Sequence, residues 1–556
     1  MLRRAALVPG LLLVLVALPN VARAGGLELT SVGTRAFGRG GAFMARSDDP
    51  TALRFNPAAL ANLGGYQLSV GSHLIFYDAC LARTGTYDQS GVSSSSPYES
   101  IFGPSYDATG YLSRDMPEVC RSGPPGPSPQ VLQSLHLMDG LGIAFGILAP
   151  AASGTSTWGN GDGTITAADG TLLPSPVRYQ VVEQSVLLFW PSIGIGYSPI
   201  PELSFGATFM WGISTIDFTT MTSAGGGPED PAQDVRAQLE LADYFVPGVV
   251  LSANITPIDA LDIAVSARFS DAIDGEGSLT VTTGAFGTSM PGSYQPYTTR
   301  LEGASLRAPQ PWEFGLAIRY ADRIHPRHRN PEQAGRLTGQ VDDPMLNERW
   351  DIELDAVYIY NGEVTDFVTR PPQGTPIGIC EEDSDCSSGP TITANLPVAI
   401  PITKGWADQL SLRLGGDVNV IPGMLAIRGG VHFETSGMNA QWQTPDFMPG
   451  MRLGFHLGAT FRIERFDVSI AYGHIFQFDH TVTDPRVRHA ASTGGRGVDD
   501  DWTCRNADGT IVEGYDPDMP VVNRGCYPPG FGSIVNGGTF RAEFNVLSLN
   551  LRYHFE

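Results

Sequence analysis

Beyond residue 24, the 556-residue sequence has no apolar run long enough to cross a membrane as a helix, which excludes a helical anchor. Its six cysteines show no CxxC spacing, so a thiolate metal site of the common kind is not expected. No GxSxG nucleophile motif accompanies its histidines, and we predict neither an enzyme nor a bound cofactor. Linker-like composition shifts and internal repeats are also absent, so one large architecture is the economical interpretation.

Residues 1–24 have the pattern of a cleaved secretory signal. Arg3 and Arg4 precede an apolar run from Leu11 to Leu18, and Ala22-Arg23-Ala24 supplies the small residues of a cleavage site. No cysteine follows that site, so a lipoprotein anchor is not expected. Without the three arginines of this segment, 32 of the 35 basic residues remain against 58 acidic ones, a net charge of −26. Such an acidic chain is unsuited to nucleic acid.

The cysteines fall into three pairs that are local in the sequence: Cys80 with Cys120, Cys380 with Cys386 and Cys504 with Cys526. Local pairing of this kind is typical of disulfides formed in an oxidising compartment. We therefore expect three disulfides in an exported protein.

Alternation of apolar and polar residues is the strongest signal in the chain. Residues 261–270 read Leu-Asp-Ile-Ala-Val-Ser-Ala-Arg-Phe-Ser, and the pattern predicts a half-buried strand. Several alternating runs reach the 9 to 11 residues that a tilted strand needs to cross a bilayer. The same period recurs at 203–213, 312–320, 350–360, 410–414, 425–433, 453–463, 466–472 and 547–555, and we expect the first strand at 66–77.

The connections between these runs alternate in length. Short turns such as Pro422-Gly423 and Glu464-Arg465 alternate with long loops near 79–130, 151–177, 222–242, 284–298, 371–404 and 485–538. This asymmetry is typical of an outer-membrane barrel, and the count predicts about fourteen strands. Strand parity then places all six cysteines in outer loops. The connection 321–349 does not fit, because it should be a short periplasmic turn.

The stretch DPTALRFNPAALANLGG, residues 49–65, stands apart from the strands. Asp49-Pro50 and Asn56-Pro57 each read as a helix N-cap followed by a proline at the first helical position. They predict short helices over 50–55 and 57–63, ended by Gly64-Gly65. The alternative is a pair of capped surface turns.

The mature start GGLELTSVGTRAFGRGGAFMARSDDPTALRFNPAALANL resembles the FadL/TodX family of outer-membrane transporters of hydrophobic compounds, with Asn56, Pro57 and Ala58 at the place of its NPA element. Residues 308–320 and 412–420 and the closing strand are also similar to the family. The resemblance implies a signal peptide over 1–24, an N-terminal hatch over 25–64 inside the lumen, and a transmembrane β-barrel over 65–556.

The resemblance also implies a route for ligand. In the family, ligand enters from outside and leaves sideways at a kinked third strand, which matches 140–154 here. Gly142 and Gly146 can weaken the strand ladder and Pro150 cannot donate to it; an ordinary strand end is the alternative. For the apolar part of the path we expect contacts from Leu27, Leu29, Phe37 and Phe55.

Parity places a set of charged residues in the lumen. Arg268, Arg428 and Arg462 are expected to face inward, and so are Asp351, Glu353 and Asp355 of the 350–360 strand. The same parity places four further residues inside: Asp262, His432, Glu434 and His456. An inward arginine can hold a carboxylate head group, although most lumen charges pair with one another. The three arginines are therefore candidate ligand contacts.

Residues 158–170, WGNGDGTITAADG, look like a calcium loop, with Asn160, Asp162, Thr164 and Asp169 at ligand positions. Trp158 stands where the first aspartate is wanted, so a plain glycine-rich turn is the alternative. Calcium in an outer loop is the one metal that the sequence suggests.

Together these features predict a monomer in the outer membrane of a Gram-negative bacterium, surrounded by its lipid. Its expected function is passive transport of long-chain fatty acids or aromatic hydrocarbons. A structural or adhesive barrel that acts through its outer loops is the alternative, and a polar-solute porin is a third reading that the hatch disfavours.

Overall fold

The computed structural model describes residues 32–87, 114–223, 229, 234–284, 296–324, 343–362, 364–372, 376–380, 386, 389–394, 396, 400–487 and 534–555.

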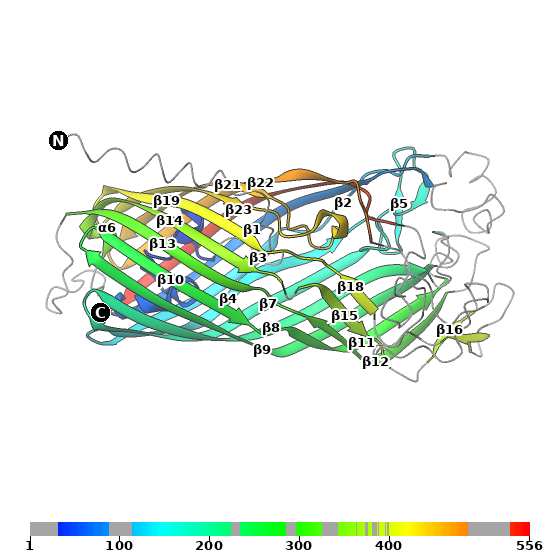
Figure 1. Cartoon of the computed structure of the whole chain (residues 1–556), viewed down its shortest axis with the longest axis horizontal. Helices are drawn as coiled ribbons and strands as arrows, with labels where there is room; N and C mark the ends of the chain where they lie inside the picture. Colours follow the sequence, from blue (N-terminus) through cyan, green and yellow to red (C-terminus); the bar gives the residue numbers. More distant parts are fainter. Residues whose placement is uncertain are drawn as a thin grey trace.

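Within this part of the chain, fourteen antiparallel strands close into a barrel (Figure 1). The ring closes where β1 pairs with β23, from Tyr66 opposite Phe555 to Arg83 opposite Gly538. The predicted number of strands is confirmed. In ring order, the strands are β1 (Tyr66–Arg83), β3 (Gly126–Met138), β4 (Leu141–Thr157), β7 (Glu183–Ile200), β8 (Leu203–Ser223), β9 (Asp234–Ile258), β10 (Leu261–Ser270), β13 (Trp312–Arg323), β14 (Glu348–Tyr360), β19 (Gln409–Ile421), β20 (Leu425–Glu434), β21 (Arg452–Ile463), β22 (Phe466–Val482) and β23 (Gly538–Phe555).

The two ends of the barrel differ. Short turns join the strands at the left end in Figure 1, which we call the turn end, and long connections gather at the opposite loop end. Strands β11, β12, β15 and β18 extend the wall beside β9 at the loop end. The elements of the loop end are β2 (Val119–Cys120), β5 (Thr164–Thr166), β6 (Leu172–Pro174), β11 (Ile273–Thr283), β12 (Tyr297–Ala308), β15 (Asp366–Arg370), β16 (Ile377–Ile379), β17 (Ile392–Ala394), β18 (Ile400–Thr403) and the 3-10 helix η6 (Ala440–Trp442).

Three short helices lie near the start of the chain: α2 (Thr34–Gly38), α3 (Ala52–Phe55) and the 3-10 helix η1 (Pro57–Asn62). A fourth, α6 (Pro344–Asn347), belongs to the connection that the strand count did not explain. It begins at Asp343, whose side chain accepts a hydrogen bond from the Met345 N–H. None of the helices in the described residues is long and apolar enough to cross a membrane.

The outward face of the barrel is apolar. On β13, alternate residues Trp312, Phe314, Leu316, Ile318 and Tyr320 are exposed, while the residues between them include Ala317 and Arg319, which are buried. The predicted parity is confirmed, because the expected inward residues Asp262, Arg268, Asp351, Glu353, Asp355, Arg428, His432, Glu434, His456 and Arg462 are all buried.

Aromatic side chains flank this apolar face in two belts. Exposed rings near the turn end include Tyr197, Tyr320, Trp350 and Phe466, and those toward the loop end include Trp211, Tyr244, Phe245, Trp312, Tyr358 and Phe478. Such belts mark the two interfaces of a membrane, because amphipathic rings are favoured at the depth of the lipid head groups. Strands β8 and β9, with 21 and 25 residues, continue well beyond the second belt.

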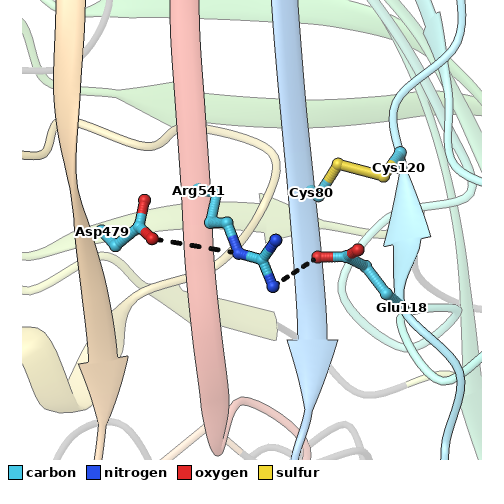
Figure 2. Close-up of a disulfide and its surroundings, with 5 residues drawn as sticks. All are labelled: Cys80, Glu118, Cys120, Asp479 and Arg541. Carbon is cyan, nitrogen blue, oxygen red and sulfur yellow. Dashed lines mark ion pairs between the residues drawn. A yellow bond between two sulfur atoms is a disulfide. The ribbon is translucent and has the colours of Figure 1, made fainter.

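Two of the three expected disulfides are formed within the described residues, Cys80–Cys120 and Cys380–Cys386; Cys504 and Cys526 lie outside these residues. The placement of Cys80 in an outer loop is wrong, whereas Cys120 lies in the connection between β1 and β3 at the loop end. Cys80 lies in β1 directly opposite Cys120 of β2, because β1 continues past the membrane-facing part of the wall. In Figure 2 the bond lies beside a row of ion pairs, in which Arg541 contacts Glu118 at 3.1 Å and Asp479 at 3.9 Å.

Peptide mapping without reduction should recover the Cys80–Cys120 and Cys380–Cys386 cross-linked peptides. Because β1 and β2 hold Cys80 and Cys120 in register, replacing Cys120 by Ser should leave a thiol at Cys80 and lower the thermal stability of the loop end. A Cys120→Ser protein with no reactive thiol at position 80, or cross-links between the two pairs, would contradict the assignment.

Candidate functional site

Residues 32–63, here called the N-terminal segment, lie inside the barrel. Every residue of the segment is buried except Arg54 and Asn62, which are half-buried. Helix α2 packs against β21 and β22, and η1 packs against β4, β7, β8 and β9. The segment therefore touches strands on opposite sides of the lumen.

Three carboxylates on the inner face of β14 hold the middle of the segment. Asp355 accepts hydrogen bonds from the backbone N–H groups of Phe43 and Met44, both at 3.1 Å. Glu353 accepts from the backbone N–H groups of Ala45 at 2.6 Å and Arg46 at 3.4 Å. Buried N–H groups need hydrogen-bond acceptors, and residues 43–46 are not in a helix or sheet that would provide them. The carboxylates of β14 provide these acceptors instead.

Arg39 adds a charged contact to the same strand. Its guanidinium is fully buried and donates to Asp351 through both terminal nitrogens, each at 2.9 Å. It also donates to Asp417 at 2.7 Å and Glu353 at 3.0 Å, and its Nε donates to the Ala42 carbonyl at 2.8 Å. All five N–H donors of this side chain thus point at oxygen atoms, an arrangement that pairing in a dry interior requires.

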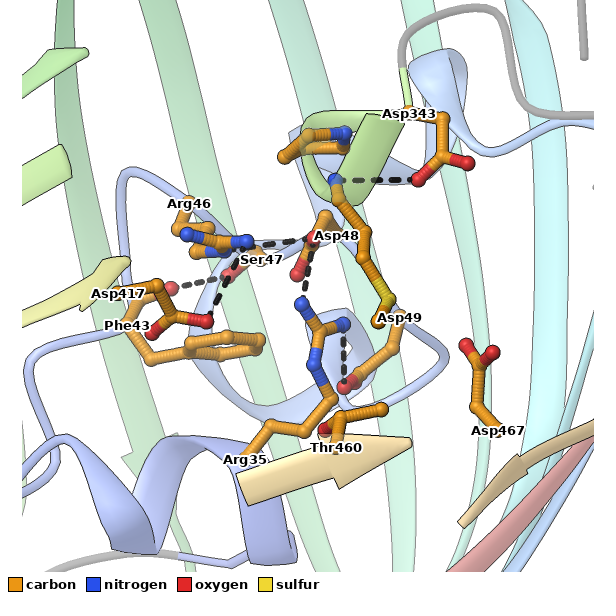
Figure 3. Close-up of polar contacts among 12 residues, drawn as sticks. Arg35, Phe43, Arg46, Ser47, Asp48, Asp49, Asp343, Asp417, Thr460 and Asp467 are labelled. Carbon is orange, nitrogen blue, oxygen red and sulfur yellow. Dashed lines mark hydrogen bonds and ion pairs between the residues drawn. The ribbon is translucent and has the colours of Figure 1, made fainter. Parts of the chain in front are cut away.

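A second group of ion pairs stabilises the fold of the segment itself. Arg35 donates to Asp48 at 2.7 Å and to Asp49 at 3.3 Å, and Figure 3 shows its side chain between the two carboxylates. Arg46 contacts Asp48 at 3.3 Å and Asp417 at 3.6 Å, so the same acidic residue of β19 receives Arg39 and Arg46.

Glycines on the inner wall make room for η1. A Cβ atom at Gly142 of β4 would lie 2.0 Å from the Leu60 carbonyl oxygen, and one at Gly196 of β7 would lie 2.5 Å from the Pro57 carbonyl oxygen. At Gly206 of β8, it would lie 2.1 Å from the Ala58 nitrogen. These separations are shorter than any nonbonded contact, so only glycine lets the 3-10 helix lie directly on the strands.

This contact gives Gly142 a further role beside the predicted one. Gly142 pairs with Gly196 of β7 in register and with His136 of β3 at the edge of a register shift, and its small size serves the contact with Leu60. Gly146 pairs in register with Leu132. A weakening of the ladder by Gly142 and Gly146 stays a prediction. Against β7, the irregular part of β4 begins beyond Leu148, where a register shift includes Pro150. A lateral exit at this place stays a prediction.

Neither predicted N-cap is found as such. Helix α3 begins at Ala52 with Thr51 at its N-cap and has no side-chain cap, although the Asp49 carboxylate accepts from the Thr51 N–H at 3.0 Å just before it. Asn56 precedes η1 but makes no side-chain cap; its amide donates instead to the Met44 carbonyl at 2.9 Å. Asn56 therefore joins the two halves of the segment, and Ala58 N–H finds its acceptor in Ser252 of the wall at 2.8 Å.

The three lumen arginines proposed as ligand contacts face inward, yet each has a protein partner. Arg268 contacts Glu313 at 2.5 Å and Arg428 contacts Asp417 at 3.3 Å. Arg462 contacts Asp467 and Asp343, both at 2.6 Å. Pairing with neighbouring carboxylates accounts for their position, and a role in ligand binding stays a prediction.

Phe37 and Phe55 are buried in different surroundings. Phe37 packs edge-on against the His456 ring at 4.6 Å between centroids, and Phe55 packs against Phe43 at 5.9 Å. Of these two rings, Phe55 belongs to the largest apolar cluster among the described residues, and Phe37 belongs to a smaller one. The other two residues of the predicted path, Leu27 and Leu29, lie outside the described residues.

The predicted calcium loop forms a hairpin between β5 and β6. Asp162 accepts from the backbone and hydroxyl of Thr164, and Asn160 donates to the same hydroxyl at 2.9 Å. Hydrogen bonds from Thr171, with help from Arg114 at 2.9 Å, lower the pKa of Asp169 to about 2. These side chains have partners within the protein, and calcium binding stays a prediction.

Sequence analysis did not identify Arg39, Arg46 or the glycines beneath η1 as parts of the site. One signal for Arg39 was present, since three acidic residues on the inner face of one predicted strand require a cation opposite them. The glycine contacts depend on which strands face η1, and only the three-dimensional structure shows this.

No family model and no curated protein matches the sequence. The fold is similar to solved structures over nearly the whole chain. A Pseudomonas aeruginosa FadL homologue superposes with a TM-score of 0.61 at 15% identity, covering 96% of this chain and 100% of that one. The Pseudomonas putida toluene transporter TodX gives 0.55 at 11% identity, covering 95% and 99%, and the Ralstonia pickettii toluene transporter TbuX gives 0.52 at 12% identity, with the same coverage.

At these identities the comparison establishes the fold. The chain has the fourteen-stranded barrel of the FadL/TodX transporters.

Proposed function

We propose that this protein lets hydrophobic small molecules diffuse passively through the outer membrane of a Gram-negative bacterium, with the N-terminal segment acting as a hatch. The loop end faces outward and the turn end faces the periplasm. The observation that carries the proposal is one continuous apolar cluster inside the barrel.

This apolar cluster extends from the loop end to the N-terminal segment. All its members are buried, and most of them contribute a large aliphatic or aromatic side chain. A hydrophobic molecule that contacts such side chains gains about 25 cal/mol per Å² of its apolar surface removed from water. Its members include Phe43, Leu53, Phe55 and Leu60 of the segment, Leu132, Leu148, Leu188, Trp190 and Met210 of the wall, and Leu241, Leu279, Leu301, Phe367 and Trp406 toward the loop end.

Buried ion pairs occupy the other side of the segment. Arg319 lies between Asp262 and Asp351, at 2.9 and 2.6 Å, and Arg552 contacts Asp467 at 2.5 Å. Because these charges are fully paired, the turn end offers little to an apolar molecule. We infer that such a molecule passes from the cluster sideways, at the irregular part of β4, rather than straight through.

The neighbours in structure support this proposal. TodX and TbuX are named as toluene transporters, and another neighbour is the monoaromatic hydrocarbon channel CymD. We extend hydrophobic transport to this chain, with fatty acids and aromatic hydrocarbons as the two candidate substrate classes.

Uptake of radiolabelled toluene and radiolabelled oleic acid by a host that lacks its own transporter tests the proposal. Expression of the protein should raise the initial uptake of at least one compound above the host baseline, while uptake of a labelled polar sugar stays unchanged. If expression raises the uptake of the sugar but not of toluene or oleic acid, the protein is a porin instead.

The hatch can be displaced by a single methyl group. In Gly206→Ala, the new Cβ overlaps the Ala58 backbone, so η1 must shift at a cost of about 1–3 kcal/mol. We expect ion conductance of single channels to rise while the heat-modifiable mobility of the folded barrel persists.

Gly429→Ala is the matched control, because the nearest atoms to its Cβ would be 3.6 Å away and none belongs to the N-terminal segment. It should conduct like the parent. Equal conductance of the Gly206→Ala protein, the control and the parent would show that the segment does not seal the lumen.

A further inference from the structure

The barrel wall is interrupted at a second place, away from β4. Strand β10 ends at Ser270 and β11 begins at Ile273; on the neighbouring strand, β12 ends at Ala308 and β13 begins at Trp312. On the turn-end side of the interruption, Arg268 of β10 pairs with Glu313 of β13. On its loop-end side, Ile273 of β11 pairs with Ala308 of β12. Residues 309–311 therefore lie between two ladders and belong to neither.

The sequence of this stretch prevents ladder bonds. It reads Pro309-Gln310-Pro311, and proline has no N–H to donate. The side chain of Gln310 is buried and donates back to the carbonyl oxygens of Ala308 at 3.2 Å and Pro309 at 3.3 Å. A side-chain amide thus takes the place of a neighbouring strand.

On the side that faces β14 and β15, the stretch also lies outside the ladders. The ladder between β13 and β14 ends at the pair Trp312–Tyr360, and the ladder between β12 and β15 begins at the pair Arg307–Val368. The interruption therefore spans three neighbouring strands of the wall, although β4 lies elsewhere in the ring.

On the outside, the interruption lies at the edge of the apolar face. Phe269 packs against Trp312 at 5.4 Å and Phe314 at 5.7 Å just below it. Just above it, Arg307 and Asp274 form an exposed ion pair at 2.5 Å. This change from aromatic to charged residues is expected where a barrel leaves the hydrocarbon of the membrane.

On the inside, the same stretch borders the apolar cluster. Ile273, Ala304, Leu306, Ala308, Val364 and Phe367 are buried members of the cluster. Two of them are alanines, which leave the inner edge of the interruption lined by small side chains. Apolar surface therefore lies on both sides of a stretch of wall that has no ladder hydrogen bonds.

We propose that this interruption is a second lateral passage, by which hydrophobic molecules move between the lumen and the outer leaflet. In the structure, the side chain of Gln310 blocks this passage. The inference rests on the proposed function. It assigns to residues 309–311 a role that is separate from the predicted exit at β4.

Replacing both prolines by valine tests the passage. The double variant Pro309→Val/Pro311→Val gains two N–H donors in a wall position that favours strand, so the ladder can extend across the interruption. Uptake of labelled toluene or oleic acid should fall by about half if two routes share the flux. Gln310→Ala removes the blocking side chain and should raise this uptake.

Pro199→Val/Pro201→Val is the matched control, since these prolines also have a Pro-X-Pro spacing but lie at the turn end between β7 and β8, away from the interruption and from the irregular part of β4. Heat-modifiable mobility of every variant establishes that it has folded. Uptake by Pro309→Val/Pro311→Val equal to that of the parent, or reduced no more than in the control, overturns the passage. Parental uptake no faster than the host baseline overturns the proposed function itself.

Discussion

The arrangement of the lumen depends on the pairing of Arg39 with the acidic residues of β14 and β19. A guanidinium with no exposure to water is tolerated only when each donor has an acceptor and the charge is balanced. Asp351, Glu353 and Asp417 supply both, at 2.7 to 3.0 Å. The dependence is mutual, because these carboxylates lie close together on neighbouring strands, and Arg39 joins Arg46 and Arg319 in balancing their charge. Breaking such a buried pair by removing one partner costs about 3–5 kcal/mol.

This contact divides the interior of the barrel into a charged part beside β14 and an apolar part beside η1. The ion pairs fix the middle of the N-terminal segment against β14, and the glycines of β4, β7 and β8 receive η1 on the other side of the lumen. The segment thereby presents Leu53, Phe55 and Leu60 to the apolar cluster and its arginines to the carboxylates. The buried apolar cluster thus extends from the loop end to the segment, and the strand pairing of the wall is irregular at two places, in β4 and at residues 309–311.

Much of the barrel could be predicted from the sequence, because alternation with a period of two is local information. It was enough to place Asp351, Glu353 and Asp355 on the inner face. Contacts between distant residues were not available in the same way. Asn56 has the residue type and position of an N-cap, but the Met44 carbonyl competes for its side chain. Cys80 was assigned to a loop because β1 extends past the membrane, where alternation no longer separates lipid from lumen. The inward arginines were found by parity, whereas their partners depend on the register between strands.

The most direct test of this account is the single-channel conductance of Arg39→Met in a planar bilayer. Arg300→Met is the control, because the ion pairs of Arg300 with Glu240 and Glu302 are exposed. If Arg39 holds the segment in place, the Arg39→Met barrel should keep its heat-modifiable mobility and conduct ions, while the parent and the control remain nearly silent. A folded Arg39→Met barrel as silent as the parent would contradict the central claim that this buried pair holds the seal.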